Sequence, residues 1–320
     1  MRYRSKDSSD DETGVPLPRA STASNARWTG NSNDQRQGLA PPVVDIALTG
    51  QCQLRCNFCW GPEHEESQRV AVTQWKRLLD RLACDGLRRV VFTGGEPLLF
   101  RGLDELLRAC RSLGVMTTLS SNGILLSRQA HLLRHTDHLG IPIDSSSVDH
   151  ADEMRPRSAR HGAWFKAIEA MRLAQEAGVA LIIRTVVTQK NVAEVARIPF
   201  VLQSCGVDLQ GPRVLYKLYQ VTPSGPIATS IPKDEWAREW AVSGDTVEEV
   251  AQSIRRNFPE LTVATQLYEH TDGRYFIIDP RGDSYGNSFD KSSEFSTAWF
   301  GNVFSDYDAS LASYWRTRIS

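Results

Sequence analysis

Three closely spaced cysteines carry the clearest chemical signal in this sequence. Cys52, Cys56 and Cys59 lie on one short stretch, directly after a strand-like apolar run at residues 43–48. A cubane 4Fe-4S cluster takes four thiolate ligands, so three thiolates would leave one iron open to a small molecule. We therefore predict an iron-sulfur site that carries out chemistry at an open iron, rather than one that only stores electrons.

A structural zinc site is the main alternative for these cysteines. Such a site requires a fourth Cys or His to complete its tetrahedron, and His64 is close enough in sequence to supply it. A zinc site, however, has no need of the glycine-rich turn that follows at residues 94–97. A disulfide is disfavoured because no secretory signal precedes the cysteines.

That glycine-rich turn is the second motif. A short β-branched strand at residues 89–93 runs into Gly94, Gly95, Glu96 and Pro97. Two glycines let the backbone approach a ligand that a Cβ atom would block, and the carboxylate can offset an ammonium group. Weaker polar matches follow at the ends of later strands, in the order Ser121, Asn122, Asp144 and Arg184.

Together these motifs resemble those of the radical S-adenosylmethionine enzymes. The Cys-x3-Cys-x2-Cys spacing, with Phe58 just before the third cysteine, is similar to the cluster loop of that family. The resemblance implies one 4Fe-4S cluster on Cys52, Cys56 and Cys59, with S-adenosylmethionine bound at the fourth iron. It also implies an electron donor such as flavodoxin or ferredoxin, and reductive cleavage to a 5'-deoxyadenosyl radical that abstracts hydrogen from the substrate.

The resemblance also implies which residues bind the cofactor. Phe58 would pack near the adenine. Gly94, Gly95 and Glu96, in the turn completed by Pro97, would meet the methionine ammonium.

Hydrogen bonds suited to the ribose hydroxyls are expected from Ser121, Asn122 and Asp144. Arg184 projects from an otherwise apolar strand, so it is the expected partner of the methionine carboxylate. The alternative for Arg184 is a solvated arginine at a strand end.

Strand and helix patterns alternate from residue 43 onward. Six strand-helix units in succession imply a parallel sheet with right-handed crossovers, and in such barrels ligands lie at the carboxyl ends of the strands. Because the motifs follow expected strands, we predict an α/β fold: an open partial (β/α)6 TIM-like barrel with a C-terminal α+β extension. The expected strands are 43–48, 90–93, 116–120, 138–143, 179–187 and 214–219, and the expected helices are 73–84, 103–113, 127–135, 163–176 and 192–205.

Composition divides the chain into three parts. Residues 1–40 are mostly polar and are expected to be a disordered leader. Residues 41–222 form the predicted core barrel, and residues 223–320 a C-terminal extension that covers the substrate. The chain has 41% hydrophobic residues and a formal charge of -1, which gives no general attraction to nucleic acid or anionic membranes. Without an apolar run long enough to span a membrane, the protein is expected to be cytoplasmic.

The remaining cysteines bear on the substrate. Cys84, Cys110 and Cys205 are scattered singly, as is usual for buried structural thiols, and none follows Cys205. Relatives that mature peptides often carry a cysteine-rich extension for auxiliary clusters, so the resemblance favours a single cluster and a small substrate.

Later features are loosely similar to viperin-like nucleotide dehydratases and to tailoring enzymes of sugar and nucleoside antibiotics, such as cytosylglucuronate decarboxylase. We expect dehydration, dehydrogenation, decarboxylation or epimerisation of an anionic nucleotide, nucleoside or sugar. The alternative is a peptide or protein substrate modified without auxiliary clusters.

Three residues are candidates for substrate chemistry. Alternation along the sixth strand would point Lys217 and Tyr219 into the barrel, where Lys217 would meet an anionic group of the substrate. Pairing of Lys217 with a distant carboxylate is the alternative. Tyr219 or Tyr275 could donate a hydrogen atom to the substrate radical. Arg155, within a basic cluster, is expected to be a solvated loop residue that could screen an anionic substrate.

Overall fold

The structure is a computed structural model that describes residues 40–61, 70–157, 160, 162–211, 213–223, 228, 230–267, 271, 273–289 and 295–319. The predicted leader up to residue 39 and the possible zinc ligand His64 lie outside the described residues. Within the described part, ten strands form one sheet in the order β10-β9-β8-β1-β2-β3-β4-β5-β6-β7. The strands are β1 Val43–Ala47, β2 Arg89–Thr93, β3 Met116–Ser120, β4 His138–Pro142, β5 Ala180–Val187, β6 Val214–Gln220, β7 Thr262–Gln266, β8 Ile277–Ile278, β9 Asp283–Phe289 and β10 Phe295–Asn302.

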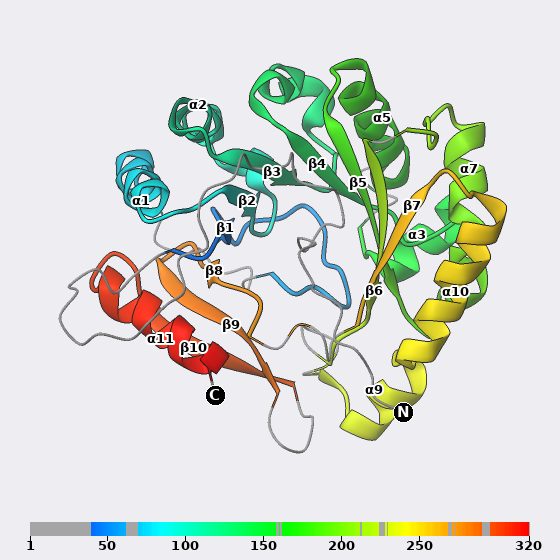
Figure 1. Cartoon of the computed structure of the whole chain (residues 1–320). Coiled ribbons are helices and arrows are strands. Elements are labelled where there is room, and N and C mark those ends of the chain that lie inside the picture. Colours follow the sequence, from blue (N-terminus) through cyan, green and yellow to red (C-terminus); the bar gives the residue numbers. More distant parts are fainter. Residues whose placement is uncertain are drawn as a thin grey trace, which may run out of the picture.

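The first six strands confirm the predicted parallel barrel. Neighbours from β1 to β6 pair in parallel, and the sheet curves so that its helices cover the outside (Figure 1). The helices are α1 Val72–Cys84, α2 Leu103–Leu113, α3 Val148–Met154, α5 Ala163–Glu176, α6 Val192–Val195, α7 Ile198–Ser204, α9 Lys233–Glu239, α10 Gly244–Asn257 and α11 Tyr307–Ile319, with the 3-10 helices η1 Pro97–Leu99 and η2 Leu126–His135.

The C-terminal third extends both edges of the same sheet. Strand β7 adds a parallel strand beside β6, and β8 adds another beside β1. Strands β9 and β10 then continue from β8 in antiparallel pairing, with α11 packed on β10. The partial barrel with a C-terminal antiparallel extension is therefore confirmed, and the extension is continuous with the barrel sheet.

Two predicted helices differ in detail. The helix expected at 127–135 is a 3-10 helix, η2, interrupted by non-helical backbone at Gln129. The helix expected at 192–205 is divided into α6 and α7, with Pro199 in the first turn of α7. Proline lacks the amide hydrogen that a continuous helix needs, so the division follows from the sequence.

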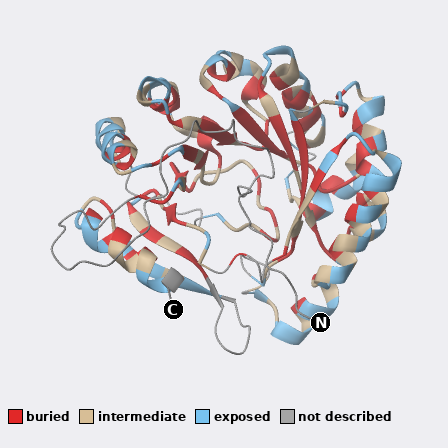
Figure 2. Ribbon diagram, in the orientation of Figure 1, coloured by how far each residue is buried: buried red, intermediate tan, exposed pale blue. Residues whose placement is uncertain are grey.

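The amphipathic pattern of the outer helices explains the core. In α1, Trp75, Leu78, Leu79 and Leu82 share the buried face, at the spacing of a helix that packs on a sheet. Figure 2 shows that buried residues line the strands and the inner sides of the helices, while the outer sides are exposed. In the C-terminal part, Trp236 and Trp240 are both buried.

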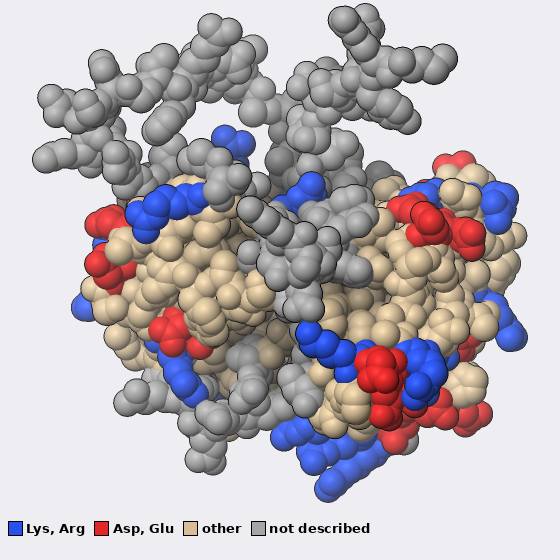
Figure 3. Space-filling view, turned by 90° about the horizontal axis from the view of Figure 1, so that it is seen from below, with Lys and Arg blue, Asp and Glu red and all other residues tan. Residues whose placement is uncertain are grey.

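Basic and acidic side chains lie next to one another on the face of the molecule shown in Figure 3. Among the described residues, we find no helix with the length and apolar character that crossing a membrane requires.

Candidate iron-sulfur and cofactor site

The three cysteines of the first motif lie on the loop after β1, inside the curve of the sheet (Figure 1). Cys56 is buried, whereas Cys52 and Cys59 are partly exposed, and all three are free thiols. They line one cavity of about 350 Å³. The other predicted site residues that line this cavity are Phe58, Gly94, Gly95, Ser121, Asn122, Arg184, Lys217, Tyr219 and Tyr275.

Three predicted cofactor residues lie outside the lining of that cavity: Glu96, Pro97 and Asp144. Pro97 opens the short helix η1 and is buried. The other two are charged, so their partners determine what they can do.

The glycine turn is held against the segment that precedes Cys52. The Gly95 amide donates to the Thr49 carbonyl at 2.6 Å, and the Glu96 amide donates to the Gln51 carbonyl at 2.8 Å. A Cβ atom on Gly94 would lie 2.4 Å from the Thr49 carbonyl oxygen, and one on Gly95 would lie 2.3 Å from that of Gln51. Both glycines are therefore required for the close approach of two loops, in addition to the ligand access predicted from sequence.

Glu96 lies behind the cavity wall. Its carboxylate is fully buried and accepts hydrogen bonds from the Ser121 hydroxyl at 2.8 Å, the Asn122 amide at 2.8 Å and the Leu98 amide at 3.1 Å. Burial raises the pKa of Glu96 to about 7, although these hydrogen bonds act to lower it. In this arrangement Glu96 fixes the loop after β3, and its direct contact with the cofactor ammonium stays a prediction.

The loop after β3 reaches the cysteine loop. Asn122 Nδ2 lies 3.7 Å from Cys52 Sγ and donates to Gln53 Oε1 at 3.1 Å. Ser121 and Asn122 both line the cavity, as the predicted ribose contacts require.

Asp144 has a different set of partners from those predicted. Its Oδ1 accepts a hydrogen bond from the Val186 amide at 2.8 Å, and its Oδ2 pairs with Arg155 Nε at 2.5 Å. The Asp144 side chain is almost fully buried in this ion pair. A contact with ribose stays a prediction that these partners do not favour.

Arg155 is the residue whose position sequence reasoning missed. It was expected in a solvated loop, but only 19% of its side chain is exposed, and it lines the cavity beside the cysteines. Arg155 Nη1 lies 3.2 Å from Cys56 Sγ, and Cζ lies 5.4 Å from the centre of the Phe58 ring. The only sequence signal was its place after β4, because the partner cysteine is far away in the chain.

The surroundings of Cys52 and Cys56 change the pKa values of their thiols. Burial raises the pKa of Cys52 to about 11, and burial also raises that of Cys56, where the charge of Arg155 acts in the opposite direction. Metal ligation requires thiolates, so metal binding here would release protons, and Arg155 would favour the ionised form of Cys56.

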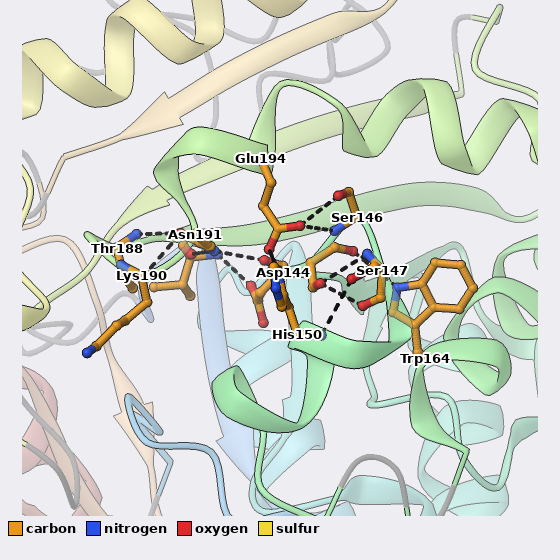
Figure 4. Close-up of polar contacts among 11 residues, drawn as sticks. Asp144, Ser146, Ser147, His150, Trp164, Thr188, Lys190, Asn191 and Glu194 are labelled. Atoms are coloured by element: carbon orange, nitrogen blue, oxygen red, sulfur yellow. Dashed lines mark hydrogen bonds and ion pairs between the residues drawn. The ribbon is translucent and has the colours of Figure 1, made fainter.

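A polar network fixes the loops after β4 and β5 (Figure 4). Asn191 Nδ2 donates to the carbonyls of Asp144 at 2.8 Å and Val186 at 2.9 Å, while its Oδ1 accepts from the Thr188 amide at 2.8 Å. Glu194 Oε2 accepts from both the amide and the hydroxyl of Ser146, at 3.0 and 2.6 Å. These contacts hold the backbone from which Asp144 reaches Arg155.

Of the predicted substrate residues, Lys217 and Tyr219 lie on β6, and Tyr275 lies two residues before β8. Lys217 is buried on β6, with Nζ 5.0 Å from the centre of the Tyr219 ring. The Tyr275 hydroxyl accepts a hydrogen bond from Gln266, and its ring lies 5.4 Å from that of Trp60. Each of these residues faces the same cavity as the cysteines, and their roles in chemistry stay predictions.

The free cysteines outside the loop differ in burial. Cys110 is buried, as predicted, but Cys84 is exposed and Cys205 is partly exposed. Burial raises the pKa of Cys110 to about 12, which makes it an unreactive thiol.

The site thus consists of a parallel barrel whose three-cysteine loop and glycine turn lie at the carboxyl ends of its strands and line one cavity. A family model for the Radical SAM superfamily matches residues 46–198. The matched stretch runs from β1 to the first residue of α7 and includes the cysteine loop, the glycine turn and the loops after β3 and β4, so the chain is similar to this superfamily over the part that holds the site.

Curated relatives with diverse substrates match parts of the chain. The Fe-coproporphyrin III synthase of Methanosarcina barkeri is 25% identical over 241 residues, which cover 74% of this chain and 58% of the relative. A PqqA peptide cyclase of Rhodopseudomonas palustris is 31% identical over 157 residues, or 47% of this chain and 41% of the relative. The chain thus spans about half the length of these relatives.

Solved structures confirm the fold. SuiB of Streptococcus suis, bound to the precursor peptide SuiA, aligns with a TM-score of 0.59 at 16% identity, covering 77% of this chain and 59% of that one. The enzyme anSMEcpe with bound AdoMet aligns with a TM-score of 0.62 at 13% identity, covering 87% of this chain and 82% of that one.

Proposed function

We propose that this enzyme cleaves S-adenosylmethionine reductively and removes a hydrogen atom from a residue of a peptide substrate. The observation that carries the proposal is a single cavity lined by the three cysteines, the glycine turn and the loop after β3, which continues to polar residues of β5 and β6. A cofactor bound at the cysteine end would thus face a substrate bound at the other end.

The residues present fit the cofactors. Cys52, Cys56 and Cys59 are unpaired thiols on one loop that faces the cavity, and they supply the three thiolates that leave one iron open. The bound cluster and S-adenosylmethionine would supply a carbon radical able to abstract hydrogen. The chain itself would orient the cofactor through Ser121 and Asn122 and exclude water with Phe58.

The peptide class rests on the named relatives. Besides the PqqA peptide cyclases, the sporulation killing factor maturation protein SkfB of Bacillus subtilis is 26% identical over 159 residues. The activity of the PqqA peptide cyclases concerns a peptide, and that of SkfB the maturation of a killing factor, which supports the peptide alternative over the small substrates expected from sequence. One cluster on Cys52, Cys56 and Cys59 stays part of this proposal, because these three cysteines share one loop that faces the cavity.

A small anionic substrate is the second candidate. It is favoured by the basic residues Arg184 and Lys217 in the cavity and by the match to the Fe-coproporphyrin III synthase, which extends over most of this chain. The nucleotides, nucleosides and sugars predicted from sequence belong to this class. Under either candidate, a flavodoxin or ferredoxin is the proposed electron donor.

Deuterium transfer distinguishes the candidates. The anaerobically reconstituted enzyme is reduced with dithionite and given either a library of perdeuterated peptides or labelled nucleotides and sugars. The proposal expects 5'-deoxyadenosine that contains deuterium only from the peptides. Cys56→Ala should form no 5'-deoxyadenosine, while Cys110→Ala, a buried thiol outside the cavity, serves as the matched control. Deuterium from the small molecules alone would overturn the peptide assignment.

A further inference from the structure

Three large apolar side chains are exposed within the described part of the chain: Phe165, Phe200 and Trp299. Phe165 and Phe200 lie on α5 and α7, two of the helices outside the barrel (Figure 1). Trp299 is the most exposed of the three, at 65%, and it lies on strand β10. Of these three residues, Trp299 is therefore the one that belongs to the sheet that forms the cavity.

Trp299 projects from the inner face of that sheet. Its cross-strand partner on β9 is Tyr285, and the centres of the two rings are 5.1 Å apart. Directly opposed residues of antiparallel strands project from the same face, and Tyr285 lines the cavity that contains the cysteines. The next residue, Phe300, is instead buried against Tyr314 of α11. The indole therefore continues the cavity wall onto the next strand.

A second cross-strand pair extends the same face. Asn287 of β9 lines the cavity, and its partner Thr297 on β10 is exposed. Each pair thus has one member in the cavity wall and one member outside it. Within the described residues β10 is the end strand of the sheet, so no further strand lies beside Trp299 there. The four side chains of the two pairs are uncharged and offer two aromatic rings, an amide and a hydroxyl.

The size of the cavity decides which substrates would reach this face. Its volume is about 350 Å³, and the cysteine loop and the glycine turn form part of its wall. With the cofactors bound, the remaining space suits one side chain of a peptide, so the residues that flank this side chain must run over the surface. A nucleotide or a sugar would stay in the cavity and would have no need of the adjoining strands.

We propose that Trp299 binds an apolar side chain of the peptide substrate, at a residue that flanks the one in the cavity. Tryptophan and tyrosine often carry much of the binding energy at interfaces, because their rings bury a large apolar area. The uncharged pairs on β9 and β10 match an apolar side chain and its neighbouring peptide groups. The site rests on the proposed peptide substrate and names a feature by which the enzyme selects it.

Equilibrium dialysis with blocked tripeptides tests the site. The reconstituted enzyme, loaded with S-adenosylmethionine, is dialysed against acetyl-Ala-Phe-Ala-amide or acetyl-Ala-Ala-Ala-amide. We expect the phenylalanine probe to bind about tenfold more tightly, because burial of its ring removes apolar surface from water. Trp299→Ser should remove most of this preference, whereas Trp299→Phe should retain it. Phe165→Ser, which removes an exposed ring from α5, is the matched control and should also retain it.

Four results would overturn the proposal. Equal binding of the two probes would show that no apolar side chain is recognised, and an unchanged preference in Trp299→Ser would place the recognition elsewhere. A wild-type dimer that Trp299→Ser dissociates in gel filtration would assign the indole to a second copy of the chain. Slower reduction of the cluster by flavodoxin in Trp299→Ser, with an unchanged rate for dithionite, would assign it to the electron donor.

Failure of the proposed function has a separate signature. Absent deuterium transfer from peptides, together with a preserved preference for the phenylalanine probe, would overturn the peptide substrate and leave an apolar binding site at Trp299. Deuterium transfer from peptides with equal binding of both probes would support the peptide substrate and remove the role given to Trp299.

Discussion

Arg155 donates a hydrogen bond to the sulfur of Cys56, with Nη1 3.2 Å from Sγ, although the two residues are 99 positions apart in the sequence. The guanidinium is held in place by Asp144, whose carboxylate lies 2.5 Å from Nε. A cation at this distance stabilises negative charge on the sulfur. The pair thus joins the loop after β4 to the cysteine loop and sets the electrostatics of one cluster ligand.

Removing that cation should change the redox potential of the cluster. In Arg155→Met the three cysteines remain, so a cluster should still assemble, but its midpoint potential should fall by tens of millivolts, because hydrogen bonds to sulfur and local charge set the potential. A redox titration followed by electron paramagnetic resonance measures the shift. Arg157→Met, an exposed arginine of the same loop, is the matched control. Equal potentials in Arg155→Met and the wild type would show that the contact has no influence on the cluster.

Asn191 should be important for stability. Its side chain is 1% exposed and its amide bonds three backbone groups, including the Asp144 carbonyl (Figure 4). Asn191→Ala leaves several buried groups unsatisfied, so the free energy of unfolding should fall by about 2 to 4 kcal/mol. Urea denaturation measures this change. Asn257→Ala removes one exposed side-chain bond and should cost less than about 0.5 kcal/mol. A comparable loss in both variants would contradict the role given to Asn191.

The cysteine loop and the glycine turn could be predicted because their signals are local. Short spacings and strand-end positions place Cys52, Cys56 and Gly94 at one end of a parallel barrel without knowledge of distant contacts. The position of Arg155 could not be predicted in this way, because its burial depends on how the segment after β4 packs on a loop far away in sequence. For the same reason, the sequence predicts that Asp144 contacts the cofactor and does not predict its ion pair with Arg155.

Strand β8 is a second feature that could not be predicted from the sequence. It has two residues, Ile277 and Ile278, and no periodic pattern can be read from so short a segment. Its place beside β1 follows from long-range pairing, which carries the C-terminal third back to the first strand of the barrel.

Glu96 should make stability depend on pH. Burial raises the pKa of its carboxyl to about 7 in the folded protein, from an ordinary value of 4.5. Its contribution to stability is therefore fully present below pH 4.5 and is lost as the pH rises to about 7. The free energy of unfolding should fall by roughly 3 kcal/mol over this interval and stay level above it.

Glu96→Gln cannot ionise, so the difference between the variant and the wild type should isolate this term. Denaturation at a series of pH values measures it, with Glu105→Gln on the exposed side of α2 as the control. The glutamine amide also faces the donors of Ser121 and Asn122, so the variant should be less stable overall. A variant that keeps the wild-type pH dependence would show that Glu96 is not its source.

The chain should hold one cluster. Only Cys52, Cys56 and Cys59 have the spacing of cluster ligands in this sequence, so anaerobic reconstitution should yield about four irons and four sulfides per chain. Chemical analysis of iron and sulfide gives the count, and Cys56→Ala should lose the visible absorbance of the cluster. About eight irons per chain would show that a second cluster is bound by other residues.

Gly140 should control the position of Arg184. The backbone of Gly140 lies outside the left-handed region, so β4 can accept an alanine at this position. The Cβ atom of that alanine would, however, collide with the Arg184 guanidinium, because its position is 2.5 Å from Cζ and 2.7 Å from Nη2. The guanidinium is planar and rigid, so it cannot bend away from the added methyl group. Gly140→Ala should therefore displace the guanidinium and break its contact with Ser120. Because Arg184 is the predicted partner of the methionine carboxylate, the affinity for S-adenosylmethionine should then fall about tenfold in equilibrium dialysis. Gly211→Ala, where a Cβ atom meets no atom within 4 Å, is the matched control, and the thermal midpoint of both variants reports whether they fold. A folded Gly140→Ala enzyme with its affinity for S-adenosylmethionine intact would show that the observed placement of Arg184 is not needed to bind the cofactor.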